Sequence, residues 1–137
     1  MARRLLVIDD EEWITEAIKR VAESLHFETR LVTDSRRAAD AFFEFEPDVV
    51  LLDLHMPDRD GLYVLNDLLT ASNTTNVIII SGGGEDALKL GDAVVKLHDA
   101  KRVTFLPKPF KRAELVKRLT EVGVAERPEP KAPSATE

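Results

Sequence analysis

Five short, mainly apolar runs recur along the chain, and each is bounded by polar or turn-forming residues. Runs of this length, without polar alternation, are typical of strands that are covered on both faces. The second run, Thr-Arg-Leu-Val, is the weakest of the five. We therefore expect five strands, at residues 5–8, 29–32, 49–52, 77–80 and 103–106.

The segments between these runs repeat apolar residues at helical spacing, which predicts a helix after each strand. Trp13 belongs to the apolar positions of the first helix, and we expect it to pack there rather than to contact a ligand. Asp34 or Ser35 is suited to cap the second helix, whereas Gly91 weakens the fourth. The apolar positions of the five predicted helices run from 13 to 25, 38 to 45, 62 to 69, 87 to 97 and 115 to 122.

Alternation of strands and helices predicts a doubly wound α/β fold with a parallel sheet between two layers of helices. The 137 residues suffice for one such domain. From about Ala125 the chain becomes rich in proline, glutamate, lysine, serine and alanine, which is typical of a tail or linker. We therefore expect a domain over residues 1–124 and a proline-rich disordered tail or linker over residues 125–137.

Composition narrows the classes of function. The chain contains no cysteine, which excludes disulfides, thiolate metal sites and a cysteine nucleophile. Its formal net charge of −6 does not favour nucleic acid, whose phosphates attract clusters of lysine and arginine. No apolar run approaches the roughly 18 residues of a membrane span, and the first is too short for a signal peptide. We expect a cytoplasmic protein with neither nucleic acid nor membrane as a direct partner.

Polar residues that could take part in catalysis or metal binding follow four of the five predicted strands. Asp9 and Asp10 come directly after the first strand, and Asp53 ends the third. Ser81 ends the fourth, before three glycines, and Lys108 follows the fifth. Ligands of open α/β sheets bind outside the carboxyl ends of the strands. The sequence therefore predicts one site at this edge, which holds three carboxylates, a hydroxyl and an ammonium group.

These residue types suit phosphoryl transfer. Mg²⁺ binds oxygen ligands and would relieve the repulsion among clustered carboxylates. Asp53 is a candidate nucleophile, because aspartyl phosphates are known covalent intermediates. Lys108 and Mg²⁺ would offset charge on the transferring group, and Ser81 would donate a hydrogen bond to it. Each residue alone has an ordinary explanation, such as acids at a helix N-terminus, but their joint position at one edge favours a site.

Several segments together match one known family. With them the chain resembles the receiver domains of response regulators in two-component signalling, over about residues 4–122. The resemblance implies a flavodoxin-like sheet in the order 2-1-3-4-5 flanked by five helices. The matching segments are Leu5 to Glu11, Asp48 to Pro57 with Asp60-Gly61, Ser81-Gly82, and Phe105 to Phe110.

The resemblance also implies roles for the residues of the metal site. Asp53 corresponds to the phosphoacceptor, Asp10 to a direct Mg²⁺ ligand and Asp9 to its water-mediated partner. The backbone carbonyl of His55 corresponds to a further ligand. Lys108 corresponds to the lysine that pairs with the phosphoryl group.

A second set of implied roles concerns the conformational change. Ser81 corresponds to the switch hydroxyl and Phe105 to the switch aromatic, which turns inward once Ser81 has moved. The peptide bond between Lys108 and Pro109 is expected to be cis. The stretch from Ser81 to Lys108 is longer than in most members of the family, which puts the shape of the usual output face in doubt.

The resemblance implies a phosphorylation-dependent switch rather than an enzyme in the usual sense. A histidine kinase or a histidine phosphotransfer protein would donate the phosphoryl group. An unknown downstream protein would bind one state, and phosphorylation could drive formation of a homodimer. The chain could be a single-domain protein or the receiver part of a longer response regulator.

Two other classes compete with this interpretation. Phosphatases of the haloacid dehalogenase type also place an aspartate at a strand end and use Mg²⁺, but they usually carry a second aspartate two residues on, where this chain has His55. A nucleotide- or flavin-binding protein has only the glycines at 82–84 in its favour. Neither a Walker A nor a dinucleotide-binding motif occurs.

Overall fold

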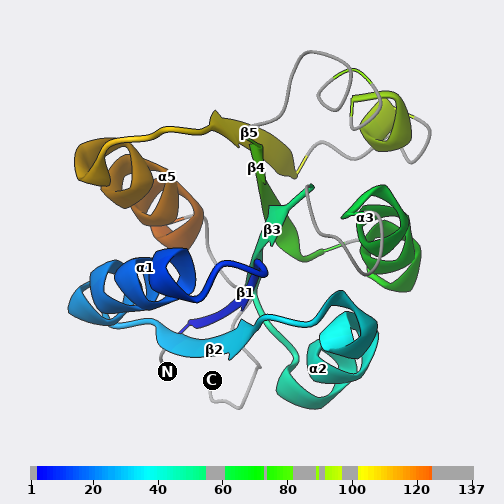
Figure 1. Cartoon of the computed structure of the whole chain (residues 1–137), viewed down its shortest axis with the longest axis horizontal. Helices are drawn as coiled ribbons and strands as arrows, with labels where there is room; N and C mark the ends of the chain where they lie inside the picture. Colours follow the sequence, from blue (N-terminus) through cyan, green and yellow to red (C-terminus); the bar gives the residue numbers. More distant parts are fainter. Residues whose placement is uncertain are drawn as a thin grey trace, which may run out of the picture.

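Five parallel strands form one sheet in the order β2-β1-β3-β4-β5 (Figure 1). Each predicted strand lies within an observed one, and the expected order is confirmed. The structure is a computed structural model, and it describes residues 3–54, 61–72, 74–81, 89, 92–96 and 102–124. The strands are β1 (Arg4–Ile8), β2 (Glu28–Val32), β3 (Val49–Asp53), β4 (Asn76–Ser81) and β5 (Val103–Pro107).

Helices follow the strands where the spacing of apolar residues predicts them. Asp34 caps a short 3₁₀ turn before the second helix, where its carboxylate accepts a hydrogen bond from the backbone N–H of Arg36 at 2.9 Å. No helix in the described part of the chain is long and apolar enough to cross a membrane. The helical elements are α1 (Glu12–Ser24), η1 (Ser35–Arg37), α2 (Ala38–Phe45), α3 (Gly61–Ala71) and α5 (Arg112–Val124).

The predicted fourth helix is described only in part. Residues 92–96 are helical, and Val94 and Val95 are partly buried against the sheet side that α2 and α3 cover. The other predicted apolar positions of this helix, Ala87, Leu90 and Leu97, lie outside the described residues.

The central strands β1, β3 and β4 are buried on both faces, which explains why they are apolar without alternation. The edge strands β2 and β5 are partly exposed. Helices α1 and α5 cover one face, and α2 and α3 cover the other (Figure 1). Successive residues of β1 point to opposite faces, so Leu5 and Val7 pack under α1 and α5, while Leu6 and Ile8 pack under α2 and α3. Burial of one such side chain contributes roughly 1.5–3 kcal/mol.

The register of the strands aligns their carboxyl ends. Ile8 of β1 pairs with Leu52 of β3, and Asp53 pairs with Ile80 of β4. Ser81, the last residue of β4, pairs with Pro107 of β5. The residues that follow these strands therefore leave the sheet at one edge, as the sequence predicts.

The expectation that Trp13 packs in the first helix is wrong, because its side chain is 73% exposed. The buried face of α1 consists of Thr15, Ile18, Val21 and Ala22. Trp13 lies at the start of the helix, on the flank of this face. The buried Thr15, which the apolar pattern does not include, donates its hydroxyl hydrogen to the carbonyl of Glu12 at 2.7 Å, so its burial leaves no unpaired polar group.

The start of α3 lies against the end of β3, directly beside Asp53. The N–H of Gly61 donates a hydrogen bond to the carbonyl of Leu54 at 3.2 Å. A Cβ atom at Gly61 would lie 2.5 Å from both the Cα and the carbonyl oxygen of Leu54. Only glycine therefore allows α3 to begin this close to the strand.

We predict that Gly61→Ala destabilises the fold by about 1–3 kcal/mol, because the added methyl group must displace the backbone of Leu54. Urea denaturation would measure the free energy of unfolding. Thr70→Ala, at an exposed position of the same helix, serves as the control and should change it by less than about 1 kcal/mol. Equal stabilities of the two variants would contradict the close approach.

Candidate functional site

Three aspartates meet at the carboxyl edge of the sheet. Asp9 and Asp10 leave the end of β1, and Asp53 ends the neighbouring β3. One carboxylate oxygen from each lies within 4.8 Å of the others. Asp9 and Asp53 are buried, at 0% and 2% exposure, and Asp10 is half-buried. The pairing of β1 with β3 therefore brings together the three carboxylates that the sequence places after these strands.

Asp9 is fixed by the backbone around it. Its N–H donates to the carbonyl of Val32 at 3.1 Å, which extends the pairing of β1 with β2 by one residue. Its Oδ1 accepts the N–H of Glu11 at 3.0 Å. The chain thus turns from strand to helix around the Asp9 carboxylate and holds it toward the site.

Lys108 supplies the cation that the sequence predicts. Its Nζ lies 3.2 Å from Oδ2 of Asp53 and 3.3 Å from Oδ2 of Asp9. It also lies 3.4 Å from Oε1 of Glu11. The Lys108 side chain is only 16% exposed, so the ammonium group is enclosed by these carboxylates. The peptide bond between Lys108 and Pro109 is cis, as expected.

Burial and mutual charge shift two pKa values in the site. Desolvation of the Asp9 carboxylate, reinforced by the charge of Asp53, raises the pKa of Asp9 from 3.8 to about 6, although the Glu11 N–H and Lys108 oppose the shift. Burial by itself lowers the pKa of Lys108, but the charges of Asp53 and Asp9 outweigh it, and the net pKa is raised. Lys108 therefore stays protonated, while Asp9 carries its charge at an energetic disadvantage.

Of the two predicted switch residues, Ser81 is described only through its backbone, whereas Phe105 is described in full. The backbone of Ser81 ends β4 at the same edge, but its side chain lies outside the described residues, as does His55. Phe105 is partly buried and packs against the core under α2 and α3. Its carbonyl accepts a hydrogen bond from the Arg118 guanidinium at 2.6 Å, which ties α5 to β5.

The sequence did not predict that Glu11 belongs to the site, where its carboxylate contacts Lys108. It occupies the N-cap position of α1, where serine, threonine, aspartate or asparagine usually bonds to the helix, yet its side chain makes no capping bond. Its carboxylate instead contacts Lys108, 97 residues away in the chain. The unusual residue type at an N-cap is the signal in the sequence that could have revealed this contact.

The donor set fits a hard divalent cation. Three carboxylates lie close together beside the Lys108 ammonium group, and two of the three are buried, where water screens their repulsion poorly. Mg²⁺ takes oxygen ligands and usually binds through a small number of carboxylates with water completing its coordination. Asp9, Asp10 and Asp53 are therefore suited to hold such an ion.

A hollow of about 500 Å³ lies beside the site, between α1 and the start of α5. We call it the α1–α5 groove. Glu11 and Lys108 line both the groove and the site, and Arg112 also lines the groove. The exposed Trp13 forms part of its wall. Its apolar lining includes Trp13, Ile14, Ala17, Pro109, Phe110 and Leu115.

Comparison with known proteins gives a consistent set of matches. Residues 5–120 match the family described as the response regulator receiver domain. The chain is 25% identical over 124 residues to the chemotaxis protein CheY of Thermotoga maritima, with 90% of this chain and 99% of that protein covered. It is 31% identical to the response regulator MprA of Mycolicibacterium vanbaalenii, with 87% of this chain but only 49% of MprA covered.

Solved structures agree with this match. A response regulator signal receiver domain from Bermanella marisrubri superposes with a TM-score of 0.75 at 28% identity, covering 89% of this chain and 98% of that one. A CheY-like receiver domain protein from Methanospirillum hungatei gives a TM-score of 0.78 at 18% identity, covering 88% and 93% of the two chains. The second likeness concerns the fold alone.

We predict that Asp9→Asn stabilises the metal-free fold at pH 8, by up to about 3 kcal/mol. Because folding raises the pKa of Asp9 from 3.8 to about 6, the wild type loses stability as the pH rises through this window, and the loss is complete above it. The variant lacks this loss, so its advantage should be larger at pH 8 than at pH 5. Urea denaturation in EDTA at both values would test this, and an advantage that does not grow with pH would contradict it.

Proposed function

Because the chain belongs to the family of response regulator receiver domains of two-component signalling, we propose that it is a switch that carries a phosphoryl group on Asp53. The observation that supports this most strongly is the enclosed Lys108 ammonium group, 3.2 Å from the Asp53 carboxylate. A carboxylate that holds a phosphoryl group needs a nearby cation to offset the added charge.

In this proposal Asp53 attacks phosphorus and the bond from phosphorus to the donor's leaving group breaks. The Lys108 ammonium then pairs with an oxygen of the phosphoryl group instead of with the free carboxylate. Ser81, at the end of β4, would donate a hydrogen bond to a second oxygen. Movement of Ser81 and Phe105 would pass the change to the face formed by β5 and α5.

The proposed cofactor is Mg²⁺, held by the side chains of Asp9, Asp10 and Asp53 with the backbone carbonyl of His55. When bound, it would neutralise charge on the phosphoryl oxygens during transfer. The protein would catalyse only its own phosphorylation and slow dephosphorylation. We therefore do not expect turnover of an external substrate.

The proposed donor is a histidine kinase or a histidine phosphotransfer protein, in keeping with the kinase partners that the family implies. The α1–α5 groove is a suitable docking surface for a helix of that donor. It shares Glu11 and Lys108 with the site, so a helix seated in it would lie next to Asp53. Its exposed Trp13 offers a large apolar contact of the kind that dominates protein interfaces.

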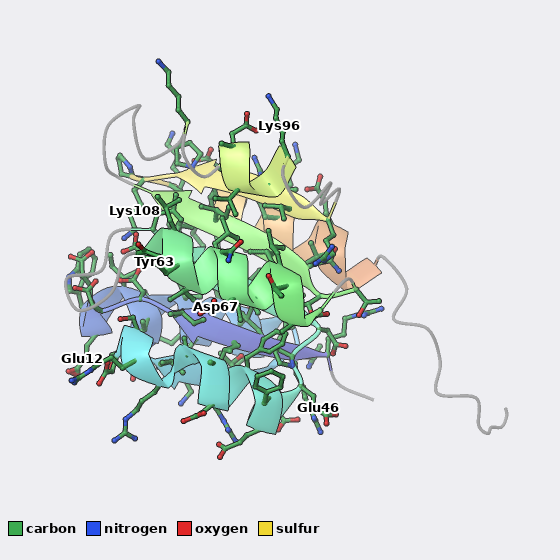
Figure 2. All side chains as sticks on the ribbon, turned by 90° about the vertical axis from the view of Figure 1, so that its right-hand side faces the viewer. Glu12, Glu46, Tyr63, Asp67, Lys96 and Lys108 are labelled. Carbon is green, nitrogen blue, oxygen red and sulfur yellow. The ribbon has the colours of Figure 1, made fainter. Side chains whose placement is uncertain are left out.

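We predict that the wild type gains the mass of one phosphoryl group on incubation with acetyl phosphate or phosphoramidate and Mg²⁺. The gain should be absent in EDTA, and absent in Asp53→Asn because the nucleophile is removed. Intact-protein mass spectrometry would measure it. Asp67→Asn is the matched control, since this aspartate lies on α3 away from Lys108 (Figure 2), and it should be modified like the wild type.

Two outcomes would contradict the proposal. A gain that persists in Asp53→Asn would place the phosphoryl group on another residue. No gain in the wild type, either with the small donors or with phosphorylated histidine kinases, would remove the phosphorylation switch altogether.

We predict that Trp13→Ala slows phosphoryl transfer from a protein donor by about tenfold, since a buried aromatic anchor contributes 1–2 kcal/mol or more to an interface. Phosphorylation by phosphoramidate, which needs no docking, should stay within about twofold of the wild type. A panel of purified histidine kinases and phosphotransfer proteins would serve as donors. Phe43→Ala is the control, because Phe43 is 65% exposed on α2, across the sheet from the groove. Equal effects of the two variants would exclude the groove.

A further inference from the structure

Glu11 is more exposed than the two other acidic residues that Lys108 contacts. Its side chain is 45% exposed, whereas those of Asp9 and Asp53 are 0% and 3% exposed. One ammonium group, that of Lys108, contacts all three carboxylates. The Glu11 carboxylate therefore lies within the length of two hydrogen bonds of Asp53, on the solvent side.

The local structure of α1 gives Glu11 no competing role. It stands at the N-cap of the helix, but its side chain bonds to no backbone N–H there. Its own backbone N–H orders Asp9, and a change of side chain would leave that hydrogen bond in place. The distinctive contribution of the Glu11 side chain is thus a negative charge next to Lys108.

We propose that Glu11 selects the ligands of the site by their charge. Its carboxylate attracts a divalent cation to the three aspartates and repels phosphodonors in proportion to their negative charge. Glu11 is therefore a positioning and selectivity residue rather than a catalytic one. The proposed repulsion of phosphodonors rests on the proposed phosphorylation of Asp53, whereas the proposed attraction of the cation does not.

The expected size follows from Coulomb's law. Removal of one charge about 6 Å away in water changes an affinity by about threefold for each unit of charge on the ligand. In Glu11→Gln, the Kd for Mg²⁺ should therefore rise by about three- to tenfold. Acetyl phosphate carries one more negative charge than phosphoramidate, so its rate of phosphorylation relative to that of phosphoramidate should increase about threefold. Both effects should shrink at high ionic strength, where charges are screened.

Two matched variants separate charge from structure. Glu11→Asp retains the negative charge and should stay near the wild type in both measurements. Glu12→Gln removes the same charge from the neighbouring residue, which lies well apart from Lys108 in Figure 2, and it should change neither value by as much as twofold. A loss of local structure at Glu11 would weaken Mg²⁺ binding and also slow phosphorylation by both donors. Loss of the charge alone weakens Mg²⁺ binding but favours the reaction with the more negatively charged donor.

The experiment uses the full chain. Isothermal titration calorimetry with MgCl₂ gives the Kd, and intact-protein mass against time gives the rates with the two donors at saturating Mg²⁺. Weaker Mg²⁺ binding together with a higher ratio of acetyl phosphate to phosphoramidate rates, in Glu11→Gln alone, would support the inference. An unchanged Mg²⁺ affinity, an unchanged donor ratio, or equal effects in Glu12→Gln would overturn it.

Failure of the two proposals can be told apart. A wild type that binds Mg²⁺ but gains no phosphoryl group contradicts the proposed function, and the Mg²⁺ titration of Glu11→Gln then decides the role of Glu11 alone. A wild type that binds no Mg²⁺ contradicts both.

Discussion

The repulsion among the carboxylates at the edge of the sheet is the constraint on which the rest of the site depends. Asp9 and Asp53 are buried on adjacent strands, where water cannot screen them well. Buried charges are tolerated only where a partner offsets them, and Lys108 is that partner. Desolvation by burial, reinforced by the charge of Asp53, raises the pKa of Asp9, although Lys108 opposes the shift. Buried carboxylates this close together favour a divalent cation, and the proposed function makes use of that preference.

The fold was predictable because burial of the strands determines the pattern of apolar residues in the sequence. Strands that are covered on both faces require apolar residues at every position, and LLVI, VVLL and VIII of the three central strands satisfy this without reference to the rest of the chain. The gathering of Asp9, Asp10 and Asp53 was predictable for a related reason. Residues that directly follow parallel strands share an edge, so sequence position fixes spatial position there.

The remaining features depend on contacts between segments that are far apart in the chain. Trp13 fits a helical apolar pattern, yet it is exposed because α5 leaves the groove beside it open. Periodicity cannot reveal which flank of a helix a distant element covers. Glu11 contacts Lys108 only because β5 ends next to β4 and directs the lysine back across the site. The close approach of Gly61 to Leu54 is likewise a property of how α3 docks, not of its sequence.

Lys108 reaches Asp9 across 99 residues of chain, and this separation ties the chemistry to the completeness of the fold. The acidic residues of the site come from the first half of the sequence, whereas Lys108 directly follows β5, the last strand of the sheet to be synthesised. A nascent or partly unfolded chain that lacks β5 has the carboxylates without the cation. If Asp53 carries a phosphoryl group as proposed, such a chain would be unable to hold it, so a cell would receive a signal only from molecules whose folding is finished.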